Sequence, residues 1–303
     1  MSGNESERSS PVVLSFDVEE HHRIEAAVGL TISDEWKVEY ADRMERSTYR
    51  ILDQLAAASV KATFFIVGQI ARTHPKLVMQ IAAAGHEVGS HSWDHQRIHR
   101  LTPETFREDL LRSKRALEDA TGQPVVGYRA PTFSVVRQTA WAVDVLAVCG
   151  LRYDSSIFPV RHDRYGVPEA PRTPFVLEGS RGSILELPPV TYRRFGQNLP
   201  VAGGGYFRLF PLAMMRAGIG QLAASEPALG MLYFHPWEFD PAQPRLPLGR
   251  VARWRTYVGI DKSTARLGRL LVRYAGRFRR AIDVAADLEP NLDRLPRFRL
   301  ATA

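Results

Sequence analysis

The sequence predicts an α/β fold in which a parallel sheet is closed into a barrel. Short apolar runs alternate along the chain with segments of helical spacing, which is the pattern of a parallel sheet covered by helices. These strand–helix units are numerous for one domain, which favours a barrel over an open sheet. Polar residues follow several of the predicted strands, as expected where the carboxyl ends of the strands meet at one face.

The first half of the chain carries the clearest elements. VVLSF at 12–16 predicts a buried strand, and apolar residues at helical spacing predict a helix from about Asp42 to Ala58. The β-branched and aromatic run at 61–67 predicts a second strand, and HEVGSH predicts a third. A proline at the start and a glycine at the end indicate a helix over PKLVMQIAAAG.

A strong helix signal opens the next part of the chain. Thr102 is expected as its N-cap, Pro103 in its first turn and Gly122 as its end. Loops are predicted at 161–173 and at GGG, residues 203–205. The remaining predicted strands and helices are the strands at 124–129, 151–156, 183–189 and 230–235 and the helices around 136–149 and 210–224.

Composition sets the class of protein and a domain plan. No apolar run approaches the roughly 20 residues that span a membrane, and residues 1–10 lack a secretory signal, so we expect a cytoplasmic protein with a disordered tail at 1–10. A single cysteine, Cys149, excludes disulfides within the chain. We expect the barrel to occupy 11–240 and a basic helical extension packed on it to occupy 241–303.

The predicted extension carries most of the positive charge. From Pro241 onward thirteen arginines and one lysine face five acidic residues. Arginines at 266, 269, 273, 277 and 280 alternate with apolar residues, which predicts an amphipathic basic helix. Such a helix could meet an acidic polymer, anionic lipid or nucleic acid, or could simply present a solvated face over the barrel.

The candidate site combines residues that are far apart in sequence. Asp17 and Glu19 end the first strand, His91 and His95 follow the third, and Arg129, Asp154 and His235 follow later strands. Two histidines four residues apart and a carboxylate are typical of a catalytic metal site with a position open to water. His99 lies four residues beyond His95, so spacing alone leaves the choice of pair open, as well as a purely structural role.

Five segments in order resemble the motifs of the NodB-type polysaccharide deacetylases, carbohydrate esterase family 4. They are SFDVEE, HEVGSHSWDH, RAPTFS, YDSS and LYFH, spread over residues 15–235. The deacetylases of bacterial exopolysaccharide gene clusters are the most similar group, on DVEE, RAPTFS and FHPWEFD. The resemblance implies a distorted (β/α)7 barrel and the removal of N-acetyl groups from a carbohydrate during exopolysaccharide synthesis, without nucleic acid as a partner.

The resemblance also implies roles for individual residues. His91 and His95 become metal ligands, with zinc expected, while Asp17 becomes the general base and His235 the general acid. Val18 stands where the family usually has a second aspartate, so Glu19 is the expected third ligand. Glu20 and His21 are the alternatives to Glu19.

Two further residues are expected to tune the base and the acid. Arg129 is expected to pair with Asp17, and Asp154 is expected to pair with His235. A guanidinium keeps a carboxylate ionised, and a carboxylate helps an imidazole to hold the proton that it donates.

Substrate contacts and rival functions complete the expectations. Pro131, Phe133, Trp237 and His22 are expected to bind substrate, with a backbone N–H after Pro131 holding the oxyanion. The basic helix offers a means of association with membrane-bound polysaccharide machinery. The rival functions are an amidase acting on a ureide or imide and a non-catalytic protein that binds sugar or polyanion.

Overall fold

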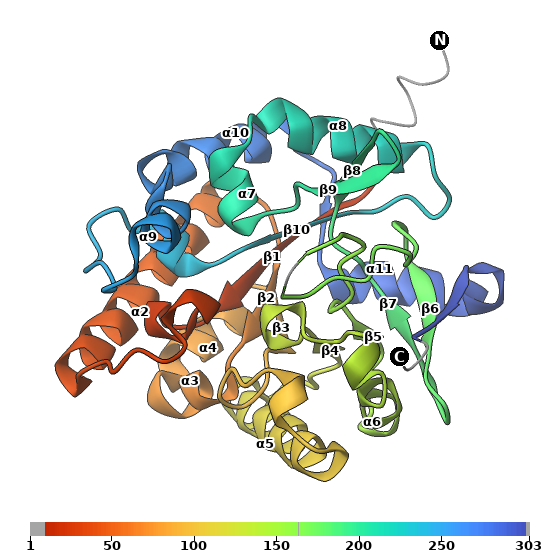
Figure 1. The fold of residues 1–303 in the computed structure, drawn as a ribbon, viewed down its shortest axis with the longest axis horizontal. Helices are drawn as coiled ribbons and strands as arrows, with labels where there is room; N and C mark the ends of the chain where they lie inside the picture. The colour runs from red at the N-terminus through yellow and green to blue at the C-terminus, as the bar shows by residue number, and fades with distance from the viewer. Residues whose placement is uncertain (1–9, 163, 301–303) are drawn as a thin grey trace.

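A largely parallel sheet forms the centre of the molecule in the computed structural model, which describes residues 10–162 and 164–300 (Figure 1). Strand β1 (Val12–Val18) lies in the middle, paired in parallel with β10 (Gly230–Phe234) and β2 (Thr63–Ile66). The expected tail at 1–10 falls almost wholly outside the described residues. The expected α/β class with a parallel sheet is confirmed.

The strand order explains how distant segments meet. It runs β10-β1-β2-β3-β4-β5-β7-β6-β12, with β11 pairing β1, and all pairs are parallel except β6 with β7. Isolated bridges join Pro189, just after β7, to Met231 of β10 and Gly203 to Tyr233 of β10, so among the described residues no ladder of strands closes the sheet into a ring. The strands not yet bounded are β3 (Glu87–Ser90), β4 (Gly127–Tyr128), β5 (Tyr153–Asp154), β6 (Phe175–Glu178), β7 (Ser183–Glu186), β11 (Phe278–Arg279) and β12 (Arg297–Arg299).

Helices surround this sheet (Figure 1). They are α2 (Asp34–Ala57), α3 (Gly68–Thr73), α4 (Pro75–Ala83), α5 (Pro103–Thr121), α6 (Ala142–Val148), α7 (Gly204–Leu209), α8 (Leu212–Ala223), α9 (Arg250–Tyr257), α10 (Ser263–Arg273) and α11 (Ala281–Leu288). The predicted cap of α5 is confirmed, because the Thr102 hydroxyl accepts the Thr105 N–H at 3.3 Å and Gly122 ends the helix at φ 66°. None of the described helices is long and apolar enough to cross a membrane.

Several elements differ from the sequence predictions. Helix α2 begins eight residues earlier than expected, since the Ser33 hydroxyl accepts the Trp36 N–H and two acidic residues occupy the first turn. The glycines at 204 and 205 open α7 instead of forming a loop. The hairpin of β8 (Thr191–Arg194) and β9 (Gln197–Pro200) was not predicted. Residues after 240 form β11 and β12 as well as helices. The expected boundary between a barrel at 11–240 and an extension at 241–303 stays a proposal.

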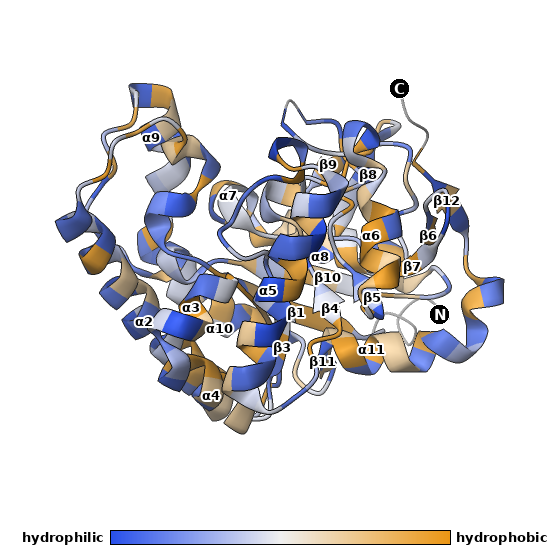
Figure 2. Ribbon diagram, turned by 90° about the horizontal axis from the view of Figure 1, so that it is seen from below, coloured by the Kyte–Doolittle hydropathy of each residue, from blue (hydrophilic) through white to orange (hydrophobic). Residues whose placement is uncertain are grey.

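Alternation along the strands separates two cores. On β1, Leu14 and Phe16 pack with the outer helices, whereas Val13 belongs to a cluster with Phe65, Met231 and residues of α11. Figure 2 shows hydrophobic residues concentrated in the strands and in α11, while α2 mixes both kinds along its length. Apolar side chains therefore fill one end of the barrel interior, and polar ones are left for the other.

Candidate metal and catalytic site

One cavity gathers most of the predicted site residues. Its volume is about 230 Å³, and its walls include Asp17 from β1, Glu19 just after β1, His91 and His95 after β3, and His235 after β10. These positions all lie at the carboxyl ends of parallel strands, where active sites of barrel folds are found. Larger hollows of about 750 and 670 Å³ lie over α3 and α5 and contain none of the predicted site residues.

The three expected metal ligands form a compact cluster. One ligand atom from each of Glu19, His91 and His95 lies within 4.8 Å of the other two. Glu19 is buried, and its Oε2 lies 2.5 Å from His95 Nε2 as an ion pair. His95 holds a left-handed backbone conformation, with φ 54°, that a residue other than glycine rarely adopts outside functional sites. A divalent cation suits this cluster, because it takes nitrogen and carboxylate oxygen ligands at such convergent positions.

The surroundings of His91 and Glu19 favour the protonation states in which these side chains can bind a cation. The His91 Nδ1–H donates to the Arg129 carbonyl at 2.8 Å, so the lone pair of Nε2 is free for a metal. Burial lowers the pKa of His91 to about 4, which keeps the ring neutral. Burial alone raises the pKa of Glu19, but the neighbouring His95, His235 and His91 outweigh it and hold this pKa well below its usual value.

A buried arginine fixes Asp17. Arg129 Nη1 donates to Asp17 Oδ1 at 2.7 Å and to the Ser15 hydroxyl at 2.8 Å. The other side of the guanidinium donates to the hydroxyl and the carbonyl of Ser155, at 2.9 and 3.1 Å. Arg129 is fully buried, over the ring of Phe65 at 4.3 Å. The expected pairing of Arg129 with Asp17 is present, and it leaves Oδ2 of Asp17 facing the cavity side.

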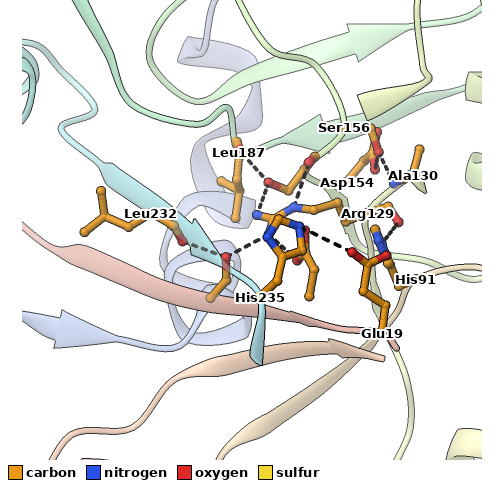
Figure 3. Close-up of polar contacts among 12 residues, drawn as sticks. Glu19, His91, Arg129, Ala130, Asp154, Ser156, Leu187, Leu232 and His235 are labelled. Carbon is orange, nitrogen blue, oxygen red and sulfur yellow. Dashed lines mark hydrogen bonds and ion pairs between the residues drawn. The ribbon is translucent and has the colours of Figure 1, made fainter. Parts of the chain in front are cut away.

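His235 lies within ion-pair distance of Asp17 and of the metal-ligand candidate Glu19. Its Nε2 is 3.9 Å from Asp17 Oδ2 and 3.8 Å from Glu19 Oε1, and its Nδ1 is 3.6 Å from Glu238 Oε1 (Figure 3 shows His235 beside Glu19). Burial alone lowers the pKa of His235, but Glu238, followed by Glu19 and Asp17, raises it to about 9. The imidazole therefore carries a proton near neutral pH.

The expected pairing of Asp154 with His235 is wrong. Asp154 Oδ1 accepts the Ser156 hydroxyl at 2.5 Å, and its Oδ2 is buried without a hydrogen-bond partner among the described residues. In Figure 3 Asp154 lies with Ser156 and Ala130, apart from His235. The reason is strand alternation, because Ser155 points inward to Arg129 and its neighbour must therefore point to the other face. Burial raises the pKa of Asp154 to about 6.

Two of the four residues expected to bind substrate line the cavity, and two do not. Phe133 and Trp237 line the cavity, and the Trp237 indole N–H also donates to Glu19 Oε1 at 3.4 Å. Pro131 is buried and lies outside the lining. The half-buried His22 also lies outside it, with its ring 6.1 Å from that of Tyr40.

The alternatives to Glu19 point elsewhere. Glu20 pairs with Arg23, and His21 is buried against Trp237 with its Nε2 at 2.9 Å from the Tyr257 hydroxyl. Neither side chain lines the cavity. Glu19 is therefore the carboxylate that the fold offers to the histidines.

Sequence reasoning missed several residues of the site. Ser15 and Ser155 hold Arg129, and the period of two along a strand, counted from Asp17, could have revealed Ser15. Thr132 lines the cavity with a left-handed φ of 56°. Glu238 lies within FHPWEFD, but no sequence signal distinguished it from the other residues of that segment.

Comparison with known proteins divides the chain into two matched parts. Residues 21–153 match the model of the polysaccharide deacetylase family, and residues 155–285 match a domain of unknown function, DUF3473. Asp17 and Glu19 precede the first match, and His235 lies in the second. The cavity therefore draws on residues from both parts and from the strand before them.

Curated relatives match only a segment of the chain. The peptidoglycan-N-acetylglucosamine deacetylase PgdA of Listeria monocytogenes is 35% identical over 103 residues, which are 31% of this chain and 22% of the relative. A chitooligosaccharide deacetylase of Bradyrhizobium sp. is 31% identical over 97 residues, 32% of this chain and 42% of the relative. The chain thus spans less than half the length of these relatives. Together with the family model, they show that this part of the chain is similar to the polysaccharide deacetylases.

Solved structures share the fold over nearly the whole chain. A Pseudomonas aeruginosa PAO1 protein classed with the polysaccharide deacetylases gives a TM-score of 0.63 at 17% identity, covering 95% of this chain and 93% of its own. The Puue allantoinase gives 0.61 at 18% identity, covering 92% and 90%. At this identity the likeness shows the fold alone, and it does not separate the two chemistries.

Proposed function

We propose that this chain, a relative of the polysaccharide deacetylases, is a metal-dependent hydrolase that removes N-acetyl groups from an N-acetylated sugar or polysaccharide. One observation carries the proposal. A cluster of Glu19, His91 and His95 shares a cavity with a fixed carboxylate, Asp17, and with His235. A metal site flanked by one base and one acid is suited to hydrolysis of an amide.

Glu19, His91 and His95 hold the cation in this proposal, and zinc is the cation that we propose. When bound, zinc would lower the pKa of a coordinated water to about 7 and would polarise the acetyl carbonyl. The hydrogen bond from His91 to the Arg129 carbonyl orients the ring, and that from Trp237 orients the Glu19 carboxylate. The protein thereby prepares the ligands before the ion arrives.

Asp17 is the proposed base. Because Arg129 occupies Oδ1, only Oδ2 is left to take a proton from the attacking water. As the water oxygen bonds to the acetyl carbon, the carbonyl oxygen gains charge that a backbone N–H can stabilise. Thr132 is the proposed donor, because it lines the cavity while the Phe133 N–H is already bonded to the Ala130 carbonyl at 3.0 Å.

His235 is the proposed acid. The electron pair of the breaking C–N bond goes to nitrogen, which takes the proton from His235 Nε2, and acetate and a free amine leave. The two carboxylates near Nε2 favour the protonated ring before the reaction. Phe133 and Trp237 offer aromatic walls of the kind that sugar rings pack against.

The narrower assignments are also proposals. We propose a role in exopolysaccharide synthesis, a cytoplasmic location and an N-acetylated carbohydrate as the partner. Helix α10 buries Leu267, Leu270 and Leu271, while Arg269 and Arg273 are exposed. This burial pattern supports a helix that packs its apolar face on the barrel and presents its basic face to solvent. The exposed arginines are available for the proposed contact with membrane-bound polysaccharide machinery.

Two rivals differ from the proposal in what they predict. A ureide or imide amidase uses the same residues, and the shared fold with an allantoinase keeps it as the second candidate. A binding protein needs neither Asp17 nor His235 beside a metal cluster, so their presence in one cavity counts against it. Activity on allantoin without activity on acetylated sugar would favour the amidase.

The test is acetate release from short N-acetylglucosamine oligomers by metal-stripped protein, with and without added zinc. We expect release only with zinc. The variant Asp17→Asn should lose turnover yet keep its zinc, measured by elemental analysis, whereas His91→Ala should lose both. Release that is independent of metal, or undiminished in Asp17→Asn, would contradict the proposed roles.

A further inference from the structure

Besides Asp17 and Glu19, a further carboxylate lies beside His235, and the family resemblance gives it no role. Glu238 is fully buried, with Oε1 3.6 Å from His235 Nδ1 and Oε2 3.4 Å from the His235 backbone nitrogen. The Nδ1 atom has no hydrogen-bond partner among the described residues and is buried. Glu238 is thus the acidic group that faces the side of the ring away from the cavity.

Glu238 is itself held by a buried cation. Arg208 Nη2 lies 3.5 Å from Glu238 Oε1, and the Arg208 side chain is almost fully buried. Its Nη1 donates to the carbonyls of Thr256 and Val258, at 2.7 and 3.0 Å. Helix α7, which carries Arg208, and the turn after α9 therefore fix the position of the carboxylate.

We propose that Glu238 is the positioning residue of His235, in the place that the resemblance gave to Asp154. This inference rests on the proposed function. Asp154 Oδ1 accepts the Ser156 hydroxyl on the other face of its strand, and among the described residues the carboxylates within 4 Å of the His235 ring nitrogens are those of Asp17, Glu19 and Glu238. The Glu238 carboxylate, 3.6 Å from Nδ1, attracts the Nδ1–H as an ion pair and so directs the Nε2–H toward the leaving nitrogen.

Charge balance gives the chemical reason. When Nε2 gives its proton to the leaving amine, the ring becomes neutral and keeps its remaining proton on Nδ1, beside Glu238. Asp17 gains a proton from the water in the same reaction. Taken together, Asp17 and His235 therefore gain one proton and lose one. A carboxylate opposite Nδ1 selects the tautomer in which only Nε2 exchanges a proton with substrate.

A purely structural role makes a different prediction. Glu238 also caps the short helical turn at Pro236–Phe239 through the His235 backbone N–H. If that were its whole role, its loss would disturb every substrate alike. If it positions the acid, its loss should matter only where the leaving group needs a proton.

The test compares two acetyl donors. N-acetylglucosamine oligomers lose an amine, which must be protonated, whereas 4-nitrophenyl acetate loses a phenolate, which need not be. Glu238→Gln keeps an oxygen for the backbone cap but removes the charge. We expect kcat on the oligomers to fall about 100-fold, in the range of general-acid effects, with KM unchanged and with hydrolysis of the ester within about threefold of wild type.

Controls separate the possible failures. Zinc content should be equal in wild type and Glu238→Gln, and Glu238→Asp, which keeps the charge, should recover part of the amide rate and serves as the variant if Glu238→Gln does not fold. Equal losses on both substrates, no loss on the amide, or a selective loss in Asp154→Asn in its place would overturn the inference. If wild type releases no acetate from the oligomers but hydrolyses the ester, the proposed function fails, and the inference fails with it.

Discussion

Replacement of Arg129 by methionine tests the buried network that holds Asp17. The guanidinium is fully buried and 2.7 Å from Asp17 Oδ1, and Asp17 is 2% exposed. Two unit charges about 4 Å apart attract by about 4 kcal/mol at an effective dielectric constant of about 20. Removal of one partner from a buried pair costs about 3 to 5 kcal/mol, because the other charge is left uncompensated. We expect Arg129→Met to lower the free energy of unfolding by this amount.

A double-mutant cycle measures the pair itself. In Asp17→Asn/Arg129→Met no charge is left alone, so the double variant should lose at least about 2 kcal/mol less than the sum of the single losses. Urea denaturation of chelator-treated protein at pH 7, followed by circular dichroism, gives these values. A loss below about 1 kcal/mol in Arg129→Met, or strict additivity in the cycle, would refute the reasoning.

Three other predictions concern different parts of the molecule. Burial lowers the pKa of His86 to about 4, so the native state resists protonation below the unfolded pKa of about 6.5; stability should fall by about 2 to 3 kcal/mol from pH 7 to 4.5, and less in His86→Asn, by urea titration at both pH values. Equal losses would contradict this assignment. A Cβ on Gly203 would lie 1.5 Å from a carbonyl of β10, so Gly203→Ala should lower the melting temperature by several degrees, whereas Gly249→Ala meets nothing within 4 Å and should not. His95→Ala should lose zinc in elemental analysis, and full retention would remove His95 from the ligand set.

The sequence predicted the fold where its signals are local. Caps such as Thr102 and Gly122, and apolar strands such as VVLSF, carry their own evidence, and both were confirmed. The start of α2 was missed because apolar spacing is weak before Tyr40, and the first two turns depend on the Ser33 cap. The two-residue strand β11 has too few residues to show a pattern.

The residues that form the site were easier to predict from the sequence than the contacts among their side chains. Parallel strands bring their carboxyl ends together, so the meeting of Asp17, His91 and His235 could be expected from order alone. Which face a side chain takes on a short strand depends on its register, and this decided against Asp154. Glu238 follows from a tight turn after β10, whose geometry only the structure gives.

The central position of β1 has a consequence for synthesis. Its partner β10 begins at Gly230, more than 200 residues later, while β2 arrives within about 50. At about 5 to 20 residues per second, a nascent chain waits on the order of 10 to 40 seconds with the backbone N–H and C=O groups along one edge of β1 unpaired. Such non-local pairing slows folding and exposes the strand to aggregation. Asp17 and His235 become neighbours only when β10 joins, so the cavity that holds both cannot form on a ribosome-bound chain until residue 235 has been made.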